Sequence, residues 1–311
     1  MRVGGATRIA VLVAAVVSAT AAPAARADHG DENLPWPQAL PPLPVSTKVQ
    51  PHGVPHCRRA SIRCMTGLEK RLRRLWRRYD RACDHRALFA IAYLRITQGL
   101  RRDLQRKHPR WFRDRRWFTF VIAAFSNRYF AWSSAYDRGR AVPIAWRITF
   151  DEARRGNANG GQDVLLASNA HTQRDLPHVY AAMGLRARDG HSHKHDHDGV
   201  NAVNTRVFDG LEDYYASHYD PFFNWIDMKP LPLDELGTQE MVKGWREGAW
   251  RNAERLLNAR TRADRRRVSA QIELNAKIWA EMIRSGEMPG YRGVRDRFCR
   301  THEAPATPFG A

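Results

Sequence analysis

Apolar residues recur at helical spacing along most of the chain after residue 65. Leu68, Leu72, Leu75 and Tyr79 stand three or four positions apart, with arginine and lysine between them. Residues at this spacing share one face of an α-helix, so the pattern predicts an amphipathic helix. The same period returns over 242–256 and 268–282, and we find no convincing run of the alternation that marks a strand.

The segment 110–137 is strongly aromatic, and apolar side chains cover most of its faces. This composition predicts a central buried helix. Pro143 favours the start of a short helix, and a further helix is predicted from about Asp163. A polar loop is predicted over 186–197. Together these elements indicate an all-α fold, an irregular bundle of about seven to nine helices.

The N-terminus has the features of an export signal. Arg2 and Arg8 precede an apolar run over 9–22, and Ala-Arg-Ala at 25–27 fits a cleavage site. We therefore predict a secreted protein, with a signal peptide over 1–27 cleaved near Ala27. A retained membrane anchor is the alternative, although the apolar run is short for a span.

Three segments follow the predicted signal peptide. Residues 28–64 are rich in proline and are predicted to form an extended arm. Residues 65–300 are predicted to form a single α-helical domain, and 301–311 a disordered tail.

Four cysteines are present, Cys57, Cys64, Cys83 and Cys299. An even number in an exported chain indicates two disulfides, and three pairings are possible. We expect Cys299 to tie the C-terminal region back to the N-terminal region. Free buried thiols are the alternative.

The formal net charge is +19, and removal of the predicted signal peptide lowers it to +16. Of the 51 basic residues 44 are arginine, a bias typical of GC-rich coding sequence. No nucleic-acid-binding motif accompanies the charge, so we expect no specific nucleic-acid partner. Loose attraction to anionic surfaces is expected. The common catalytic and nucleotide-binding signatures are also absent from the sequence.

The segment 169–176, Asn-Ala-His-Thr-Gln-Arg-Asp-Leu, is the strongest candidate site. On a helix His171 and Asp175 share one face, with Asn169 near its edge. Such a pair is able to bind a divalent metal such as Zn²⁺, or to pair internally for proton transfer. Two structural interpretations stay open: Asp175 caps a new helix before Pro177, or His171 is a hydrogen-bonded core histidine.

Four histidines and two aspartates lie within residues 191–198. Stretches of this kind bind zinc, copper or nickel weakly. His195 and His197 are candidate ligands here, and Asp198 is a candidate to complete a site with His171 and Asp175. A solvated loop, with Asp198 as the N-cap of the next helix, is the alternative.

Arg128 lies among apolar neighbours inside the aromatic segment. A buried charge requires a partner, and we expect Asp151 or Asp175 to provide it. A structural salt bridge is the favoured interpretation, and a substrate-binding arginine is the alternative.

Three motifs occur in order along the chain: F-x-N-R-Y at 125–129, N-A-H-x-x-x-D-L at 169–176 and D-x-x-N at 198–201. Together they resemble an uncharacterised bacterial family of unknown function that is frequent in high-GC Gram-positive organisms. The resemblance covers about residues 85–225. It implies an α-helical domain with a polar cluster and no established activity.

The spacing of His171 and Asp175 is also similar to that in zinc-dependent phospholipases C and the related single-strand nucleases, which are exported and all-α. Those enzymes use a mature N-terminal tryptophan as a metal ligand, whereas this chain is expected to begin at Asp28. Their other helical pairs of metal ligands are also missing here. The likeness serves only as an analogy.

Two hypotheses follow for the function. The favoured one is an exported binding or structural protein with a buried polar cluster formed by Asn127, Arg128, Asn169, His171 and Asp175. The other is a secreted metal-dependent hydrolase of phosphoester or lipid substrates. Asn169, His171 and Asp175 would line its site, and Asp198 or a loop histidine would complete it. Both require the separate polar segments to meet inside the bundle, and both leave the metal, the substrate and the oligomeric state open.

Overall fold

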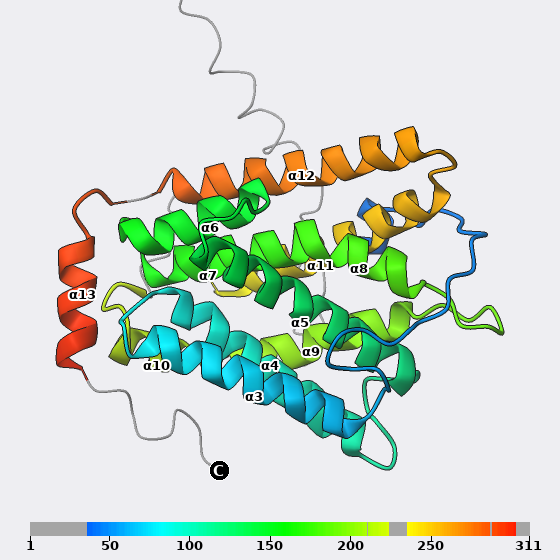
Figure 1. Cartoon of the computed structure of the whole chain (residues 1–311), viewed down its shortest axis with the longest axis horizontal. Coiled ribbons are helices and arrows are strands. Elements are labelled where there is room, and N and C mark those ends of the chain that lie inside the picture. The colour runs from blue at the N-terminus through cyan, green and yellow to red at the C-terminus, as the bar shows by residue number, and fades with distance from the viewer. Residues whose placement is uncertain (1–35, 210, 224–234, 287, 303–311) are drawn as a thin grey trace, which may run out of the picture. The chain divides into compact units, whose positions relative to one another are not determined.

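The computed structural model describes residues 36–209, 211–223, 235–286 and 288–302 (Figure 1). These residues form α-helices and one π-helix and no strand, so the predicted all-α fold is confirmed. The predicted signal peptide and all but the first two residues of the predicted tail lie outside the described residues. Within the described part, no helix is both long and apolar enough to cross a membrane.

The described part of the proline-rich segment starts with a short helix, α2 (Trp36–Ala39), and the residues that follow it lie along α11 (Glu235–Asn258) without regular structure. The backbone N–H of Leu43 donates to Glu254 Oε2 at 2.9 Å, and the Thr47 hydroxyl donates to the Leu257 carbonyl at 3.1 Å. Proline lacks a backbone N–H, so a proline-rich segment cannot form a regular ladder of its own hydrogen bonds. Contacts to α11 fix its position instead.

The first long helix is α3 (Ile62–Asp80), which packs against α4 (Arg86–Gln105). Ser61 is the N-cap of α3, since its hydroxyl accepts a hydrogen bond from the backbone N–H of Cys64 at 3.2 Å. The predicted apolar positions Leu68, Leu72 and Tyr79 are buried.

The aromatic segment forms α5 (Arg115–Asp137), and α6 (Ile144–Arg155) follows directly after Pro143. The helix begins at Arg115, because Asp114 accepts a hydrogen bond from the backbone N–H of Trp117 at 2.8 Å and caps the first turn. The N-terminal half of α5 is buried on most of its faces, as predicted.

The candidate motif lies on one long helical segment with three parts: α7 (Gly160–Asn169), the π-helix η1 (Ala170–Asp175) and α8 (Leu176–Met183). The segment starts at Gly160 because Asn159 and Gln162 form a reciprocal capping box. Asp175 does stand directly before α8, which begins at Leu176, but it has helical dihedral angles and its side chain makes no cap hydrogen bond, so the helical segment continues through it.

The helices α9 (Lys194–Asp209) and α10 (Glu212–His218) precede α11, and α12 (Arg262–Arg284) and α13 (Arg292–Thr301) follow it. The loop predicted over 186–197 is shorter than expected, because α9 begins at Lys194. The buried carboxylate of Asp196 holds this end of α9 in place: it accepts hydrogen bonds from the backbone N–H groups of Arg113 at 2.7 Å and Asp114 at 2.9 Å.

Two disulfides are present, Cys57–Cys64 and Cys83–Cys299, with Cα–Cα distances of 5.2 and 5.9 Å. The second confirms that Cys299 ties the C-terminal region to the N-terminal region, since it connects α13 to the turn between α3 and α4. Disulfides persist in oxidising compartments, and this pairing indicates that the chain folds in such an environment.

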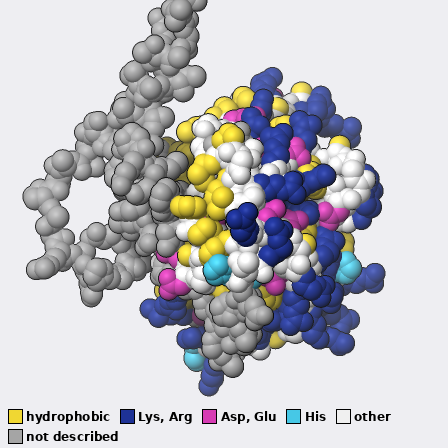
Figure 2. Space-filling view, turned by 90° about the vertical axis from the view of Figure 1, so that its left-hand side faces the viewer, with side chains coloured by type: hydrophobic (Ala, Val, Ile, Leu, Met, Phe, Trp, Pro, Cys, Tyr) yellow, Lys and Arg dark blue, Asp and Glu magenta, His cyan; other side chains and the backbone are white. Residues whose placement is uncertain are grey.

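The buried apolar side chains form two clusters. The first contains residues of α6, α7 and α10, and the second contains residues of α5, α8 and α11; α4 contributes to both. The helix that carries the candidate motif passes from the first core to the second at η1. Phe125 packs against both cores. On the outer face shown in Figure 2, lysine and arginine side chains are spread widely and outnumber the acidic ones.

Candidate functional site

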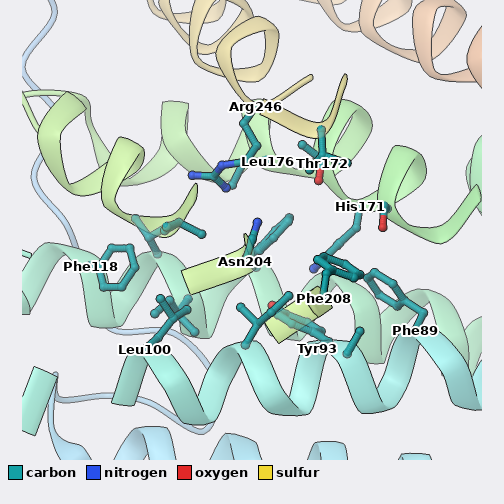
Figure 3. Close-up of a pocket in the computed structure, with 18 of the residues that line it drawn as sticks. Phe89, Tyr93, Leu100, Phe118, His171, Thr172, Leu176, Asn204, Phe208 and Arg246 are labelled. Atoms are coloured by element: carbon teal, nitrogen blue, oxygen red, sulfur yellow. The ribbon is translucent and has the colours of Figure 1, made fainter. Parts of the chain in front are cut away.

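A cavity of about 80 Å³ lies where the two cores meet (Figure 3). Helices α4, α5, α9 and α11 contribute to its wall together with the η1–α8 segment, and most of the lining is apolar. The polar side chains in the wall include His171, Tyr180, Asn204 and Arg246. A concave, mostly apolar site with a few convergent polar groups is typical of small-molecule binding.

His171 lies on η1 and is 2% exposed. Its ring stacks on Phe125 with 3.4 Å between centroids and 4° between planes, and Tyr93 meets it edge-on at 5.0 Å. Burial among these rings lowers the pKa of His171, because the effect of burial is larger than the opposite effect of Asp175. The imidazole is therefore neutral at neutral pH.

Asp175 is fully buried and orients this imidazole. Its Oδ2 lies 3.3 Å from His171 Nδ1, while the indole N–H groups of Trp132 and Trp146 donate to the carboxylate at 3.1 and 2.9 Å. Arg174 pairs with it at 2.8 Å. Burial alone would raise the pKa of Asp175. The hydrogen bonds and charges of His171 and Arg174 have the larger effect and lower this pKa below its usual value, so the carboxylate is ionised.

The tautomer of His171 follows from this pairing. An ionised carboxylate only accepts hydrogen bonds. His171 Nδ1 therefore carries the proton of the neutral ring and donates a hydrogen bond to Asp175. Nε2 is then an acceptor. This atom is buried and has no hydrogen-bond partner among the described residues, in a side chain that lines the cavity.

The cavity wall also contains Arg246, which is 5% exposed. Its Nε donates to Asn201 Oδ1 at 2.7 Å, and its Nη2 donates to the backbone carbonyl of His197 at 2.5 Å. Asn204 lies between Arg246 and His171 (Figure 3), and its buried Oδ1 has no partner in the described structure. The cavity therefore has two unpaired acceptors and one buried cation in its wall.

Two of the predicted cluster residues have structural contacts elsewhere. The Asn169 side chain donates to the Ala276 carbonyl at 2.8 Å, which fixes the end of α7 to α12, and its Oδ1 accepts from Gln173 Nε2 at 2.8 Å. The expectation that Arg128 pairs with Asp151 or Asp175 is wrong. Asp151 accepts from the Tyr136 hydroxyl and Asp175 pairs with Arg174, while Arg128 is half-buried. Phe125, rather than Arg128, connects this motif to His171.

The histidine-rich segment divides between surface and core. His195 and Asp198 are exposed, whereas His197 is 1% exposed and its Nδ1 lies 2.7 Å from the Tyr180 hydroxyl. In the described part of the chain, the one set of three side chains close enough to share a metal is His197, Asp198 and Glu247, within 4.8 Å of one another. The ammonium of Lys194 contacts both carboxylates, at 2.5 and 2.8 Å. His171 and Asp175 are not in this set.

Sequence reasoning missed Arg246 and Asn204. Arg246 is one of 44 arginines, and the helical pattern gives no sign that it points inward. Asn204 is a single amide on a helix with a mixed pattern. The D-x-x-N motif drew attention to Asn201, which is the hydrogen-bond partner of Arg246.

A family model described as "Family of unknown function (DUF5995)" matches residues 66–286. The chain belongs to this family. The DUF5995 match is longer than the 85–225 expected from the motifs, and it contains every residue of the cavity wall. Cys57, Cys64 and Cys299 lie outside it. No curated protein and no solved structure matches the chain.

Proposed function

We propose that this protein binds a small, largely apolar molecule in the cavity between its two cores, and that His171 accepts a hydrogen bond from that molecule. One observation carries the proposal: the buried Nε2 of His171 has no partner within the described residues and belongs to the cavity wall. A hydroxyl or amine of a ligand would supply the missing donor.

The cost of an unpaired buried acceptor supports this proposal. Leaving such a group without a hydrogen bond costs about 1–3 kcal/mol, and most buried polar side-chain atoms in proteins have a partner. Here the Asp175 carboxylate and two tryptophans fix the ring in the orientation that leaves Nε2 free. π-Helices such as η1 also occur frequently at functional sites.

Metal binding at His197, Asp198 and Glu247 is a second candidate, because their ligand atoms lie within 4.8 Å. A divalent ion there would have to displace the ammonium of Lys194. At Asp175, by contrast, N–H donors already contact both carboxylate oxygens, which favours ligand binding over metal-dependent hydrolysis at this pair. Elemental analysis of purified protein separates the two candidates: about one equivalent of metal, lost in Glu247→Gln, would favour the metal site.

We further propose that the chain is exported and that residues 1–27 are removed near Ala27. The two disulfides support folding in an oxidising compartment. Mass spectrometry of the protein recovered from the medium of expressing cells tests the cleavage position.

Ligand binding is tested with small hydroxyl probes such as isobutanol and 1-propanol. The ¹⁵N chemical shift of His171 Nε2 should move on saturation, because the unpaired acceptor gains a hydrogen bond, and the melting temperature should rise by ligand linkage. His171→Phe should lose the rise, whereas His195→Ala, on the exposed side of α9, should keep it. Probes that leave the Nε2 shift of the native protein unchanged would contradict the proposal.

A further inference from the structure

We infer that the ligand of this cavity is a small monocarboxylic acid whose carboxylate pairs with Arg246. This inference rests on the proposed function, which it makes specific: the proposal requires only a small molecule that donates to His171, while the inference gives that molecule a negative charge at its other end.

The inference starts from the uncharged surroundings of Arg246. Within the described structure, its guanidinium contacts only uncharged groups: the amide oxygen of Asn201, the backbone carbonyl and ring Nδ1 of His197, and the Tyr180 hydroxyl. Among the described residues, no carboxylate lies within 4.0 Å of this side chain. A charge that is buried without an opposite charge is costly for a folded protein, so a counter-ion supplied from outside would stabilise the site.

The nearest acids already have partners. Lys194 pairs with Asp198 and with Glu247, and Arg251 pairs with Glu247 and with Glu254. These two cations face three carboxylates, and none of the three carboxylates forms an ion pair with Arg246. Arg246 is left over from this set of ion pairs.

The two titratable rings that contact Arg246 do not supply the missing charge. Burial raises the pKa of Tyr180 to about 12, against the opposing effect of Arg246, so its hydroxyl stays protonated. Burial, with the positive charges of Arg246, Lys194 and Arg251, lowers the pKa of His197 far below its usual value. Both groups are neutral, and the site keeps the full positive charge of the guanidinium.

The geometry of the cavity suits an acid with a short apolar body. Arg246 and His171 enter from the side opposite Tyr93 and Leu100, with Asn204 between them (Figure 3). A guanidinium binds a carboxylate through two parallel N–H groups, which fixes the orientation of the ligand. The apolar part would then lie against the aromatic and aliphatic wall contributed by α4 and α5.

The volume limits the size of the acid. An engineered protein cavity of about 150 Å³ accepts benzene, and this one measures about 80 Å³. The space therefore fits a branched or linear acid of roughly three to five carbons, and a long-chain fatty acid would not fit without rearrangement of the wall.

The test compares isobutyrate with isobutyramide, a neutral molecule of nearly the same shape, by calorimetric titration of the disulfide-intact protein. Isobutyrate should bind at least tenfold more tightly. Arg246→Gln should remove this preference, whereas Arg206→Gln, an exposed arginine on α9, should keep it. The ¹⁵Nε resonance of Arg246 in the native protein should also shift with isobutyrate, which gives a measurement that does not depend on folding of the variant.

The outcomes separate this inference from the proposed function. Equal binding of acid and amide, with no shift of the Arg246 resonance, would overturn the carboxylate and leave small-molecule binding intact. If the acid, the amide and the hydroxyl probes all fail to bind to the native protein, the proposed function fails with it.

Discussion

At the scale of single residues, Asp175 makes more polar contacts than its neighbours in the motif. It accepts hydrogen bonds from two indoles, pairs with Arg174 and orients His171, all from a fully buried position. A carboxylate in such a place stabilises the fold only while these partners are present. It therefore couples the stability of the core to the orientation of the ring at the cavity.

Asp175→Asn should lower the free energy of unfolding by about 3–5 kcal/mol, the usual cost of breaking a buried ion pair. The matched control is Glu273→Gln, which removes the other, partly exposed partner of Arg174 and should cost about 1 kcal/mol or less. Urea denaturation measures both. Similar losses in the two variants would show that the carboxylate of Asp175 has no special role.

Stability should fall as the pH is lowered from about 6.5 to 4. Burial, with the charges of Arg174, Arg128 and Arg265, lowers the pKa of His178 to about 4, against the weaker opposing effect of Asp175. In this window the unfolded chain takes up a proton that the folded chain does not, so stability is present above the unfolded pKa of about 6.5 and is lost on acidification. The pKa values of His171, His193 and His197 are lowered in the same direction.

Denaturation at several pH values tests this dependence. His178→Gln should flatten the slope by up to about 1.4 kcal/mol per pH unit. His195→Gln, on an exposed side chain, should leave the slope unchanged. A His178→Gln profile that overlays the native one would rule out His178 as a contributor.

Part of the site could be predicted at this scale and part could not. The pairing of His171 with Asp175 follows from a spacing of four residues on a helix. The position of Arg128 depends on the rotation of α5 about its axis: Phe125 and Tyr129 face His171, and Arg128 is turned about 100° from Tyr129. That rotation is set by packing between helices, and a pattern with apolar residues on most faces does not reveal it.

At the scale of elements, local signals predicted most helices well. The helical period and the caps depend on neighbouring residues, so α3, α6 and α12 lie close to where the sequence indicated. The start of α9 was misjudged because Asp196 and His193 look like solvated loop residues. Both are buried, through backbone donors at 113 and 114 and through stacking on Trp117, and these contacts come from distant parts of the chain.

Two helical glycines give a matched test of how α9 and α11 are packed. A Cβ at Gly199 of α9 would lie 2.5 Å from the backbone oxygen of Trp111, whereas a Cβ at Gly248 of α11 would meet no atom within 4 Å. Gly199→Ala should therefore destabilise the protein by about 1–3 kcal/mol. Gly248→Ala should stabilise it by up to about 1 kcal/mol, through higher helix propensity. Thermal unfolding compares the two, and stabilisation in both would show that α9 does not press on the loop at 111.

At the scale of the whole molecule, the two disulfides differ in the length of chain that they close. Cys57 and Cys64 are seven residues apart, whereas Cys83 and Cys299 are 216 apart. Loop-closure entropy grows with this separation, so the long link constrains the unfolded chain more strongly. It also fixes α13, which lies beyond the segment matched by the family.

Removing the long link by Cys83→Ala with Cys299→Ala should cost about 5 kcal/mol, and removing the short one by Cys57→Ala with Cys64→Ala about 2.5 kcal/mol. Guanidinium denaturation of the two oxidised double variants measures the difference. Equal losses of unfolding free energy would indicate that the Cys83–Cys299 disulfide does not stabilise the protein by constraining the unfolded chain.

The π-helix η1 has a consequence for any change in chain length at this point. Residues before it pack into one core and residues after it into the other, so its wide turns set the angular offset between two otherwise separate interiors. Deleting a single residue from the α-helical end of α7, directly before η1, would turn η1 and α8 by about 100° relative to the start of α7. The helices on each side of the deletion would keep the contacts within their own core. The two cores could no longer pack against each other, and the cavity between them would lose its shape.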